Sequence, residues 1–476
     1  MVGNQDTLGD EVVLSGQKGR FAFSLGQFHL SNDGFRDNND VEHDIYNVFA
    51  QAALAPWLDV QAEYRHRDTD QGDIDFDFDP DDFSPFDRRE IDQDSFRVGA
   101  HIDPDPMSDV LLSFIYSDRG ETLKQFGPPD VDADVDLEGY DAQGQYIFNS
   151  RFFNLTAGGG YSDLDRDSRD VLDFSAILPF CPLPGGCTID SSDDIEQYNS
   201  YIYGNVNLPQ DVTLTLGVSY DSYDEGTIKT DRFNPKVGLR WNITRNLQLR
   251  AAYFKTLKRE LVIDQTLEPT NVAGFNQFFD DFNGTKTERY GIGLDATITP
   301  DLHAGVEVSR RKLEVPSDLG GGGSITEEED EDLYRAYLYW TPLDQLALSA
   351  EVVYDGFDRD PEIDVGQPDE VETFSVPLEA RYFHPSGVFA SLGVTPVWQD
   401  IHFKSGSSRY EETDFAVVDG SLGFRLPKRR GIISLEVRNL FDEDFDFQDD
   451  NFRSSESSNP QFTPERTFML RGTINF

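Results

Sequence analysis

The chain ends in Thr467-Phe468-Met469-Leu470-Arg471-Gly472-Thr473-Ile474-Asn475-Phe476. From Phe468 to Phe476 every second position is apolar or glycine, and polar residues fill the positions between, with Met469 as the one exception. Successive side chains of a β-strand point to opposite faces, so the stretch predicts a strand with one apolar and one polar face. Such a strand fits a soluble sheet as well as the wall of a membrane barrel. Whether the pattern recurs along the chain decides between the two.

The same two-residue period recurs from about residue 20 onward. The clearest runs are 58–65, 212–220, 236–243, 302–309 and 345–354. In the second run, for example, Val212, Leu214, Leu216, Val218 and Tyr220 alternate with small polar residues and glycine. No helical period of comparable length competes. The pattern therefore predicts an all-β chain.

The connections between these runs alternate between short and long. Short turns fall near residues 55–56, 103–106, 149–150, 209–210, 244–246, 299–301, 341–344, 384–387 and 427–430. Long polar segments lie near 31–43, 66–94, 118–136, 162–195, 221–232, 255–284, 314–330, 356–371, 399–413 and 442–464. This alternation is typical of an antiparallel up-and-down transmembrane β-barrel with short periplasmic turns and long acidic extracellular loops.

The count of connections predicts about 20 strands, within a range of 18 to 22, with both termini periplasmic. Residues 1–18 are expected to be a linker or N-terminal tail, holding at most part of a strand, and residues 19–476 the barrel. Open strand edges are forbidden in hydrocarbon, so the strands must close on themselves. A barrel of this width leaves a channel unless something partly fills its interior.

Aromatic residues support the membrane assignment. Six tyrosines stand in phase with the apolar face, each near the end of a strand that enters a long segment: Tyr64, Tyr116, Tyr161, Tyr220, Tyr253 and Tyr354. Each follows the first apolar residue of its strand by about six to eight residues, which at ~40° tilt spans roughly 16–21 Å of an apolar band ~25 Å tall. Three tryptophans lie beside short turns and suit an opposite girdle: Trp57, Trp241 and Trp340.

Composition sets further limits. The 476 residues carry a net charge of −49, which excludes general nucleic-acid binding because that needs a basic surface. No run approaches the length of a membrane-spanning helix. The first residues have neither the basic start nor the apolar core of a signal peptide, so an exported protein would be in its mature form. Cys181 and Cys187 flank a Pro- and Gly-rich loop, which favours a disulfide over a metal pair.

Charged residues on the polar phase of the strands are the candidate functional set. We expect nine of them to line the lumen and set selectivity: Arg65, Arg97, Arg240, Arg250, Glu307, Arg335, Glu351, Glu379 and Arg381. The alternative is that they only pair with each other across strands. A weak Ca²⁺ site could form at Asp73, Asp75, Asp77 and Asp79, although a solvated acidic surface is the favoured interpretation, and no other cofactor is expected. No catalytic motif was found, so the chain is not expected to be an enzyme.

Two stretches carry a family resemblance. The run from Phe233 to Tyr253, and Asn439-Leu440-Phe441-Asp442 followed by Arg466-Thr467-Phe468, resemble the barrels of TonB-dependent receptors. The final strand ending in Phe476 likewise resembles the C-terminal segment of bacterial outer-membrane barrels. In that family a plug domain and a TonB-contacting box precede a barrel of about 22 strands. Here alternation begins near Phe21, which leaves no room for a plug among these residues.

The resemblance implies an outer-membrane transport barrel that passes a bulky solute, with its gating domain absent or removed. A plugless export or diffusion pore, or a surface-anchored protein that binds a partner through acidic loops, are the alternatives. The expected location is the bacterial outer membrane. Expected partners are outer-membrane lipid, lipopolysaccharide and a periplasmic or upstream plug or helical-repeat domain; the sequence does not name the solute.

Overall fold

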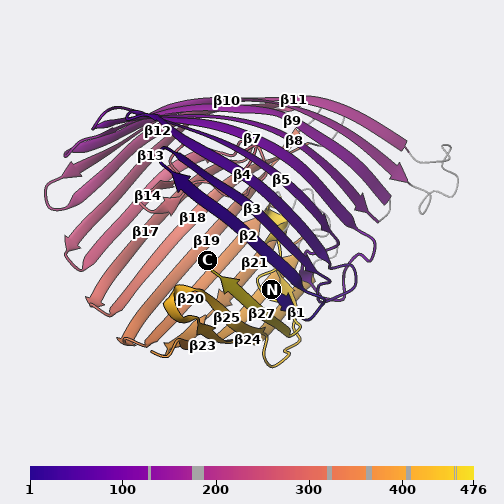
Figure 1. The fold of residues 1–476 in the computed structure, drawn as a ribbon. Helices are drawn as coiled ribbons and strands as arrows, with labels where there is room; N and C mark the ends of the chain where they lie inside the picture. Colours follow the sequence, from indigo (N-terminus) through magenta and orange to yellow (C-terminus); the bar gives the residue numbers. More distant parts are fainter. Residues whose placement is uncertain are drawn as a thin grey trace.

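The computed structural model describes residues 1–126, 130–173, 187–318, 324–360, 367–403, 409–454, 456 and 458–476. One antiparallel sheet of 23 strands curves into a barrel (Figure 1). Its strands are β1 (Val2–Gly3), β2 (Leu8–Lys18), β3 (Phe21–Asn32), β4 (Val41–Ala55), β5 (Leu58–Gln71), β7 (Arg88–Asp105), β8 (Ser108–Gln125), β9 (Asp130–Asn149), β10 (Phe153–Asp173), β11 (Cys187–Leu208), β12 (Val212–Glu225), β13 (Ile228–Thr244), β14 (Leu247–Leu257), β17 (Lys286–Thr299), β18 (Leu302–Asp318), β19 (Ser324–Leu343), β20 (Leu346–Arg359), β21 (Glu370–Ser375), β22 (Leu378–Phe383), β23 (Val388–Phe403), β24 (Arg409–Arg425), β25 (Gly431–Arg438) and β27 (Thr467–Ile474).

Four short strands lie outside this sheet in two pairs. The first pair is β15 (Asn271–Val272) with β16 (Phe275–Asn276), and the second is β6 (Asp77–Phe78) with β26 (Phe447–Gln448). The 3-10 helices are η1 (Pro427–Arg429) and η2 (Asn451–Arg453). In the described part of the chain no helix has the length and apolar character needed to cross a membrane.

The barrel has 22 strand positions, because β21 and β22 share one place between β20 and β23. The ladder breaks between them at Pro377, which has no N–H to donate. The predicted all-β, up-and-down barrel is confirmed, and its strand number lies within the predicted range. We call the two rims the short-turn end and the long-loop end, after their connections.

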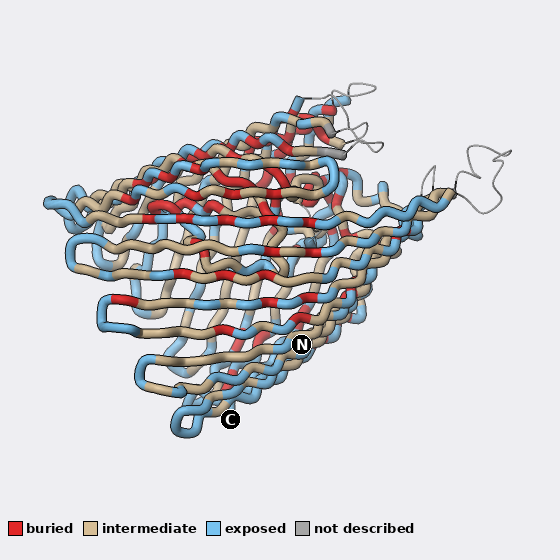
Figure 2. Tube along the Cα trace, turned by 90° about the horizontal axis from the view of Figure 1, so that it is seen from above, coloured by how far each residue is buried: buried red, intermediate tan, exposed pale blue. Residues whose placement is uncertain are grey.

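The apolar face of the wall points outward. Along β12, Leu216 and Val218 are 49% and 39% exposed, whereas Thr215 and Ser219, which flank this stretch on the opposite face, are 7% and 1% exposed. Figure 2 shows the same alternation of buried and exposed residues along strand after strand. A soluble protein places these two classes the other way round, so the outer surface suits lipid and the inner surface suits water.

Aromatic side chains form rows on this outer face. Tyr64, Phe96, Tyr116 and Tyr140 are successive cross-strand partners near the long-loop end. Tyr161 pairs with Tyr198 across strands. Further along the wall the rings of Tyr198 and Tyr220, of Tyr253 and Tyr290, and of Tyr334 and Tyr354 lie 5.7, 5.1 and 5.3 Å apart. Trp57 occupies the turn between β4 and β5, and Trp241 and Trp340 face outward close to short turns. The eight predicted girdle residues that belong to strands are therefore on the outer face, and Trp57 lies in a turn; their anchoring role in lipid stays a prediction.

The strands extend further than the sequence suggested. β9, β10 and β11 are 20, 21 and 22 residues long, so they include much of the segment 162–195 that we expected to be a loop. The acidic run 327–332 likewise belongs to β19. Residues 1–18, expected as a tail, form β1 and β2, and β2 pairs with β3 along its whole length. These extensions are rich in acidic residues and lack the alternation of apolar and polar residues that predicts a strand. Outside the apolar band of the wall, both faces of a strand can be polar.

The shortest strand of the barrel sheet, β1, closes it between β2 and β27. Val2 pairs with Leu8 on one side and with Leu470 on the other. Asn4 adds two contacts to Phe468: its backbone N–H donates to the carbonyl oxygen at 3.1 Å, and its side-chain oxygen accepts from the backbone N–H at 2.8 Å. C-terminal to Leu470, β27 runs on toward the short-turn end. The side of the membrane that each terminus faces stays a prediction.

Candidate functional site: the barrel lumen

The nine charges predicted to line the lumen all lie on the inward phase of their strands. Most take part in ion pairs along the inner wall. Arg97 pairs with Glu63, Arg250 with Asp295 at 2.6 Å and Glu307 at 2.9 Å, Arg335 with Glu351 at 2.7 Å, and Arg381 with Glu379 at 2.6 Å. Arg65 is half-buried and Arg240 exposed. These residues therefore face the lumen and most of them are paired; their role in selectivity stays a prediction.

The connection between β14 and β17 folds into the lumen. We call it the inner segment, residues 258–285, and it carries the β15–β16 hairpin. Its contacts follow the wall strands in order from β7 to β18. They join Arg97 to Gln265, Gln143 to the backbone N–H of Leu267 at 2.6 Å, Tyr203 to Glu268 at 2.7 Å, Arg289 to the carbonyl of Asn276 at 3.0 Å, and Arg311 to Asp281 at 2.5 Å. The inner segment thus lines a large part of the luminal wall.

A buried charge cluster holds the middle of the inner segment. The Arg259 guanidinium lies 3.2 Å from Asp221 and 3.3 Å from Glu268, and the Lys236 ammonium lies 3.9 Å from Glu268. All four residues are at most 5% exposed. Breaking a buried pair costs far more than breaking a surface pair, because one charge is left unpaired in a poorly solvated place. This cluster fixes where the inner segment lies against β12 and β13.

Aromatic residues pin the β15–β16 hairpin. Phe275 packs beneath the guanidinium of Arg250, whose central carbon is 5.3 Å from the ring centroid. The wall makes room for the ring at Gly291, where a Cβ would stand 2.4 Å from a ring carbon. The Arg311 guanidinium lies only 3.8 Å from the centroid of Phe279. Cation–π contacts of this kind add to the ion pairs in holding the segment.

Two further connections pack against the opposite wall. Residues 72–87 and 439–466, which we call the cap segments, are joined by the β6–β26 pair. The Phe415 ring of β24 stacks on Phe445 at 3.9 Å, and Phe76 and Phe447 complete the same buried cluster. These are inward-facing positions, so an apolar core fills this part of the lumen. The sequence left two alternatives, a partly filled interior or a wide channel, and these connections and the inner segment partly fill the interior.

Asp449 ties the cap segments together. Its carboxylate accepts hydrogen bonds from the backbone N–H groups of Phe76 at 2.9 Å and Asn451 at 3.0 Å. Burial raises the pKa of Asp449 to about 7, against the opposing effect of those two hydrogen bonds. The group therefore changes charge near neutral pH.

A chain of ion pairs connects the inner segment to the cap segments. Arg311 of β18 contacts Asp281 at 2.5 Å and Glu331 of β19 at 2.5 Å. Arg453 of η2 lies 3.7 Å from Glu331 and 3.0 Å from Asp355 of β20. Arg311 and Asp281 are buried, and burial raises the pKa of Asp281 although Arg311 opposes the rise. The inner segment and the cap segments thus share one network of ion pairs.

A cavity of about 840 Å³ separates the inner segment from the inner faces of β5 and β7 to β12. Its size is in the range of small-molecule sites. Its wall arginines are paired: Arg89 with Glu121 at 2.8 Å, and Arg119 with Glu456 at 2.7 Å. Burial would raise the pKa of Glu456, but Arg119 and Arg67 hold it below its usual value. The lining holds seven carboxylates and five cationic side chains, so its net charge is negative.

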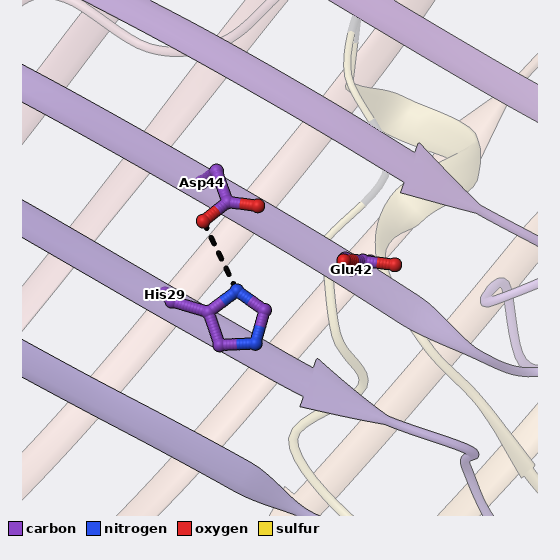
Figure 3. Close-up of side chains that lie close together, drawn as sticks. All are labelled: His29, Glu42 and Asp44. Atoms are coloured by element: carbon purple, nitrogen blue, oxygen red, sulfur yellow. Dashed lines mark hydrogen bonds and ion pairs between the residues drawn. The ribbon is translucent and has the colours of Figure 1, made fainter.

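Among the residues that the structure describes, three groups of one histidine and two carboxylates could hold a metal ion. Two face outward beyond the tyrosine rows: His66 with Asp92 and Asp94, and the group in Figure 3, where His29 Nδ1 lies 3.0 Å from Asp44 and Glu42 stands nearby. The third, Asp59, His101 and Asp103, faces the lumen.

The predicted acidic site differs from these groups. Asp73 accepts from the backbone N–H of Ser84 at 2.7 Å and lies 3.4 Å from Arg36, and Asp77 lies in β6. Ca²⁺ binding at Asp73, Asp75, Asp77 and Asp79 stays a prediction. The predicted disulfide also stays untested, because Cys181 lies outside the described residues.

Sequence reasoning missed most of the luminal contacts. Lys236 is on the polar phase of a predicted strand and could have been included. Arg259, Glu268 and Asp281 lie in a segment without periodicity, so nothing local indicated that it turns inward. Asp59 and His101 are direct cross-strand partners, which only the register of β5 and β7 reveals.

Comparisons with known proteins place this geometry in context. A family described as "TonB dependent receptor-like, beta-barrel" matches residues 14–261. A comparison with curated proteins finds no match. Among solved structures, the copper transporter OprC has a TM-score of 0.72 at 12% identity, covering 100% of this chain and 79% of that one. The pyoverdine outer-membrane receptor FpvA from Pseudomonas aeruginosa PAO1 has 0.71 at 14%, covering 100% and 77%. The ferric citrate transporter FecA has 0.71 at 13%, covering 99% and 76%. At these identities the likeness shows the fold alone.

Proposed function

Since this chain belongs to the family of TonB-dependent receptor-like β-barrels, we propose that it passes a bulky polar solute across the bacterial outer membrane through its lumen. The family and the fold are those of transport receptors, not of enzymes. The proposal that the solute is bulky and polar rests on the lumen itself. The observation that carries it is the cavity of about 840 Å³ between the wall and the inner segment.

The inner segment is the element that would have to move. It contacts the wall from β7 to β18 mainly through side chains. Its backbone continues into the sheet at its two ends, in β14 and β17. Release of these contacts would widen the lumen without breaking any ladder of the wall. We therefore propose that residues 258–285 constrict the path in the described part of the chain, whether or not a separate gating domain acts on them.

Conductance in a planar lipid bilayer tests the proposal. The test variant replaces residues 260–283 with a short Gly-Ser linker, and the control variant is Arg310→Ala, which alters an outward-facing side chain of β18. We expect low conductance for the wild type and the control, and large, cation-preferring conductance for the linker variant. Large conductance of the wild type would instead support the plugless export or diffusion pore. No conductance from any of the three would overturn a transport role.

One observation favours the second candidate function, a surface-anchored protein that binds a partner through its acidic rim. Beyond the tyrosine rows, Asp94, Asp118, Glu138, Asp165 and Asp194 are successive cross-strand partners on the outer face. Like charges placed directly opposite destabilise a sheet, so this row gains from a cationic partner. Lipopolysaccharide, other outer-membrane lipid and a plug or helical-repeat domain stay predictions as partners.

A further inference from the structure

The inner wall at the short-turn end carries a histidine surrounded by carboxylates from three strands. His101 and Asp103 belong to β7, Asp59 to β5, and Asp109 to β8. His101 Nε2 lies 2.9 Å from Asp103 Oδ1 and 3.0 Å from Asp109 Oδ1. The ligand atoms of Asp59, His101 and Asp103 all lie within 4.8 Å of one another.

The backbone builds this convergence. Asp59 and His101 are direct cross-strand partners. The register of β7 against β8 shifts between Ile102 and Asp105, next to the turn, and this shift brings Asp103 and Asp109 to the same nitrogen. The backbone N–H of Asp103 donates to the carbonyl of Trp57 at 2.9 Å, which fixes its position. The group is therefore held by the wall and not by a loose connection.

Hydrogen bonding alone satisfies this arrangement poorly. One imidazole nitrogen has one proton to donate, yet two carboxylates approach Nε2 of His101 at about the same distance. Metal–ligand bonds of 2.0–2.2 Å place tetrahedral ligand atoms about 3.4 Å apart, so the two separations from His101 Nε2 to Asp103 and Asp109 need to widen by only a few tenths of an ångström. A dication between these atoms would satisfy all of them.

The other two histidine groups lack this geometry. At His29 and at His66 a single carboxylate lies 3.0 Å from Nδ1, and the second contact of His66, to Asp92, is 3.9 Å from the other ring nitrogen. Both face outward. They serve as natural controls for the luminal group.

We propose that Asp59, His101, Asp103 and Asp109 bind a divalent first-row transition-metal ion at the luminal wall. One imidazole with several carboxylates suits borderline ions such as Zn²⁺, Mn²⁺ or Fe²⁺ better than Ca²⁺, which prefers oxygen ligands only. The histidine and two of the carboxylates are 34–40% exposed, so an ion can enter from the lumen. The proposal does not depend on the transport role.

The site adjoins a small cavity below the inner segment. Asp59 and His101 line this space of about 210 Å³, and Gln265 to Leu267 of the inner segment form part of its boundary. Arg97, the cation in the same lining, is already paired with Glu63. An ion at His101 would therefore meet the carboxylates of Asp59, Asp103 and Asp109, and the one arginine of that lining is already paired.

Zn²⁺ titration of the full chain in detergent, followed by calorimetry, tests the proposal. We expect His101→Ala to weaken the tightest Zn²⁺ site by more than about tenfold, since even groups that only orient metal ligands contribute that much. Asp109→Asn, which keeps the side-chain shape, should also weaken it. His29→Ala should leave that site unchanged.

Two results would overturn the proposal. One is a Zn²⁺ isotherm that is the same for His101→Ala and the wild type. The other is equal displacement of the bound Zn²⁺ by Ca²⁺ at matched concentrations, which would reduce the site to a general acidic surface. Refolded yield and thermal unfolding of each variant, measured alongside, separate loss of the site from loss of the fold.

Discussion

Replacing Arg311 with alanine should release the inner segment from the luminal wall. Arg311 donates to Asp281 at 2.5 and 2.7 Å and to Glu331 at 2.5 Å, and its side chain is only 8% exposed. The substitution leaves Asp281, 12% exposed, as a buried carboxylate without its cation. Arg311 belongs to the wall and Asp281 to the connection between β14 and β17, so the lost energy should appear as undocking of residues 258–285.

The magnitude follows from the burial of the pair. Removing one partner of a buried ion pair costs about 3–5 kcal/mol, and the lower figure applies where water can reach the lumen. About 3 kcal/mol corresponds to roughly a hundredfold shift from docked to undocked inner segment. Hydrogen–deuterium exchange of the backbone amides in residues 258–285 measures this shift directly.

The neighbouring residue provides a matched control. Arg310 precedes Arg311 in β18 but faces outward and is 45% exposed. It also contacts two carboxylates, Asp330 at 2.7 Å and Asp332 at 3.3 Å. Exposed pairs contribute about 0–1 kcal/mol, so Arg310→Ala should barely change exchange in the inner segment. The double variant Arg311→Ala with Asp281→Ala should recover part of the protection, because Asp281 no longer leaves a buried unpaired charge, while the contact of Arg311 with Phe279 stays lost.

The defect should also depend on pH. Burial raises the pKa of Asp281, and loss of Arg311 removes the group that opposes this rise. A carboxyl whose docked pKa is above its undocked value favours docking at low pH and loses that contribution as pH rises through the docked pKa. Exchange in Arg311→Ala should therefore be faster at pH 8 than at pH 5 after correction for intrinsic rates. Equal exchange in Arg311→Ala and Arg310→Ala would refute this reasoning.

Three further predictions concern the cap segments, the inner hairpin and the outer face. Because burial raises the pKa of Asp449 to about 7, the cap contacts should be most stable in acid and weaken as pH rises through 7, and Asp449→Asn should abolish that dependence in amide exchange of residues 439–454. Gly291→Ala should destabilise docking of the β15–β16 hairpin by about 1–3 kcal/mol, because the new Cβ would overlap the ring of Phe275. Gly144→Ala is the control, because a Cβ there meets its nearest neighbour at 3.5 Å, and amide exchange of residues 270–278 measures the difference between the two variants. Leu112→Lys on the lipid face should cost about 2–4 kcal/mol in urea unfolding from vesicles, and Ser113→Lys on the luminal face should cost much less; equal costs would contradict the outward assignment of Leu112.

The wall of this barrel could be predicted because its information is local. A period of two assigns each residue to a face without knowledge of its neighbours, so Leu216 and Tyr116 were correctly placed on the outer side and Arg250 on the inner side. The limits of the strands were less accessible. Where β10 and β19 leave the apolar band, neither face needs apolar residues, and the period fades although the ladder continues.

The luminal site could be predicted only in part for a different reason. Arg335 and Glu351 belong to adjacent predicted strands, so their pairing follows from topology. The partners Asp221 and Arg259 come from a strand and an aperiodic segment, and only a folded chain brings them together. The group around His101 depends on a register shift beside a turn, which no composition or period encodes.

The closure at β1 has a mechanical consequence. β10 and β11 are joined by a ladder of twenty residue pairs, whereas β1 meets β2 at one pair and β27 at two. A ring of strands yields first at its weakest joint. Heat, denaturant or lateral tension should therefore part this barrel between its first and last strands, and Asn4 is the residue whose loss would lower that threshold most.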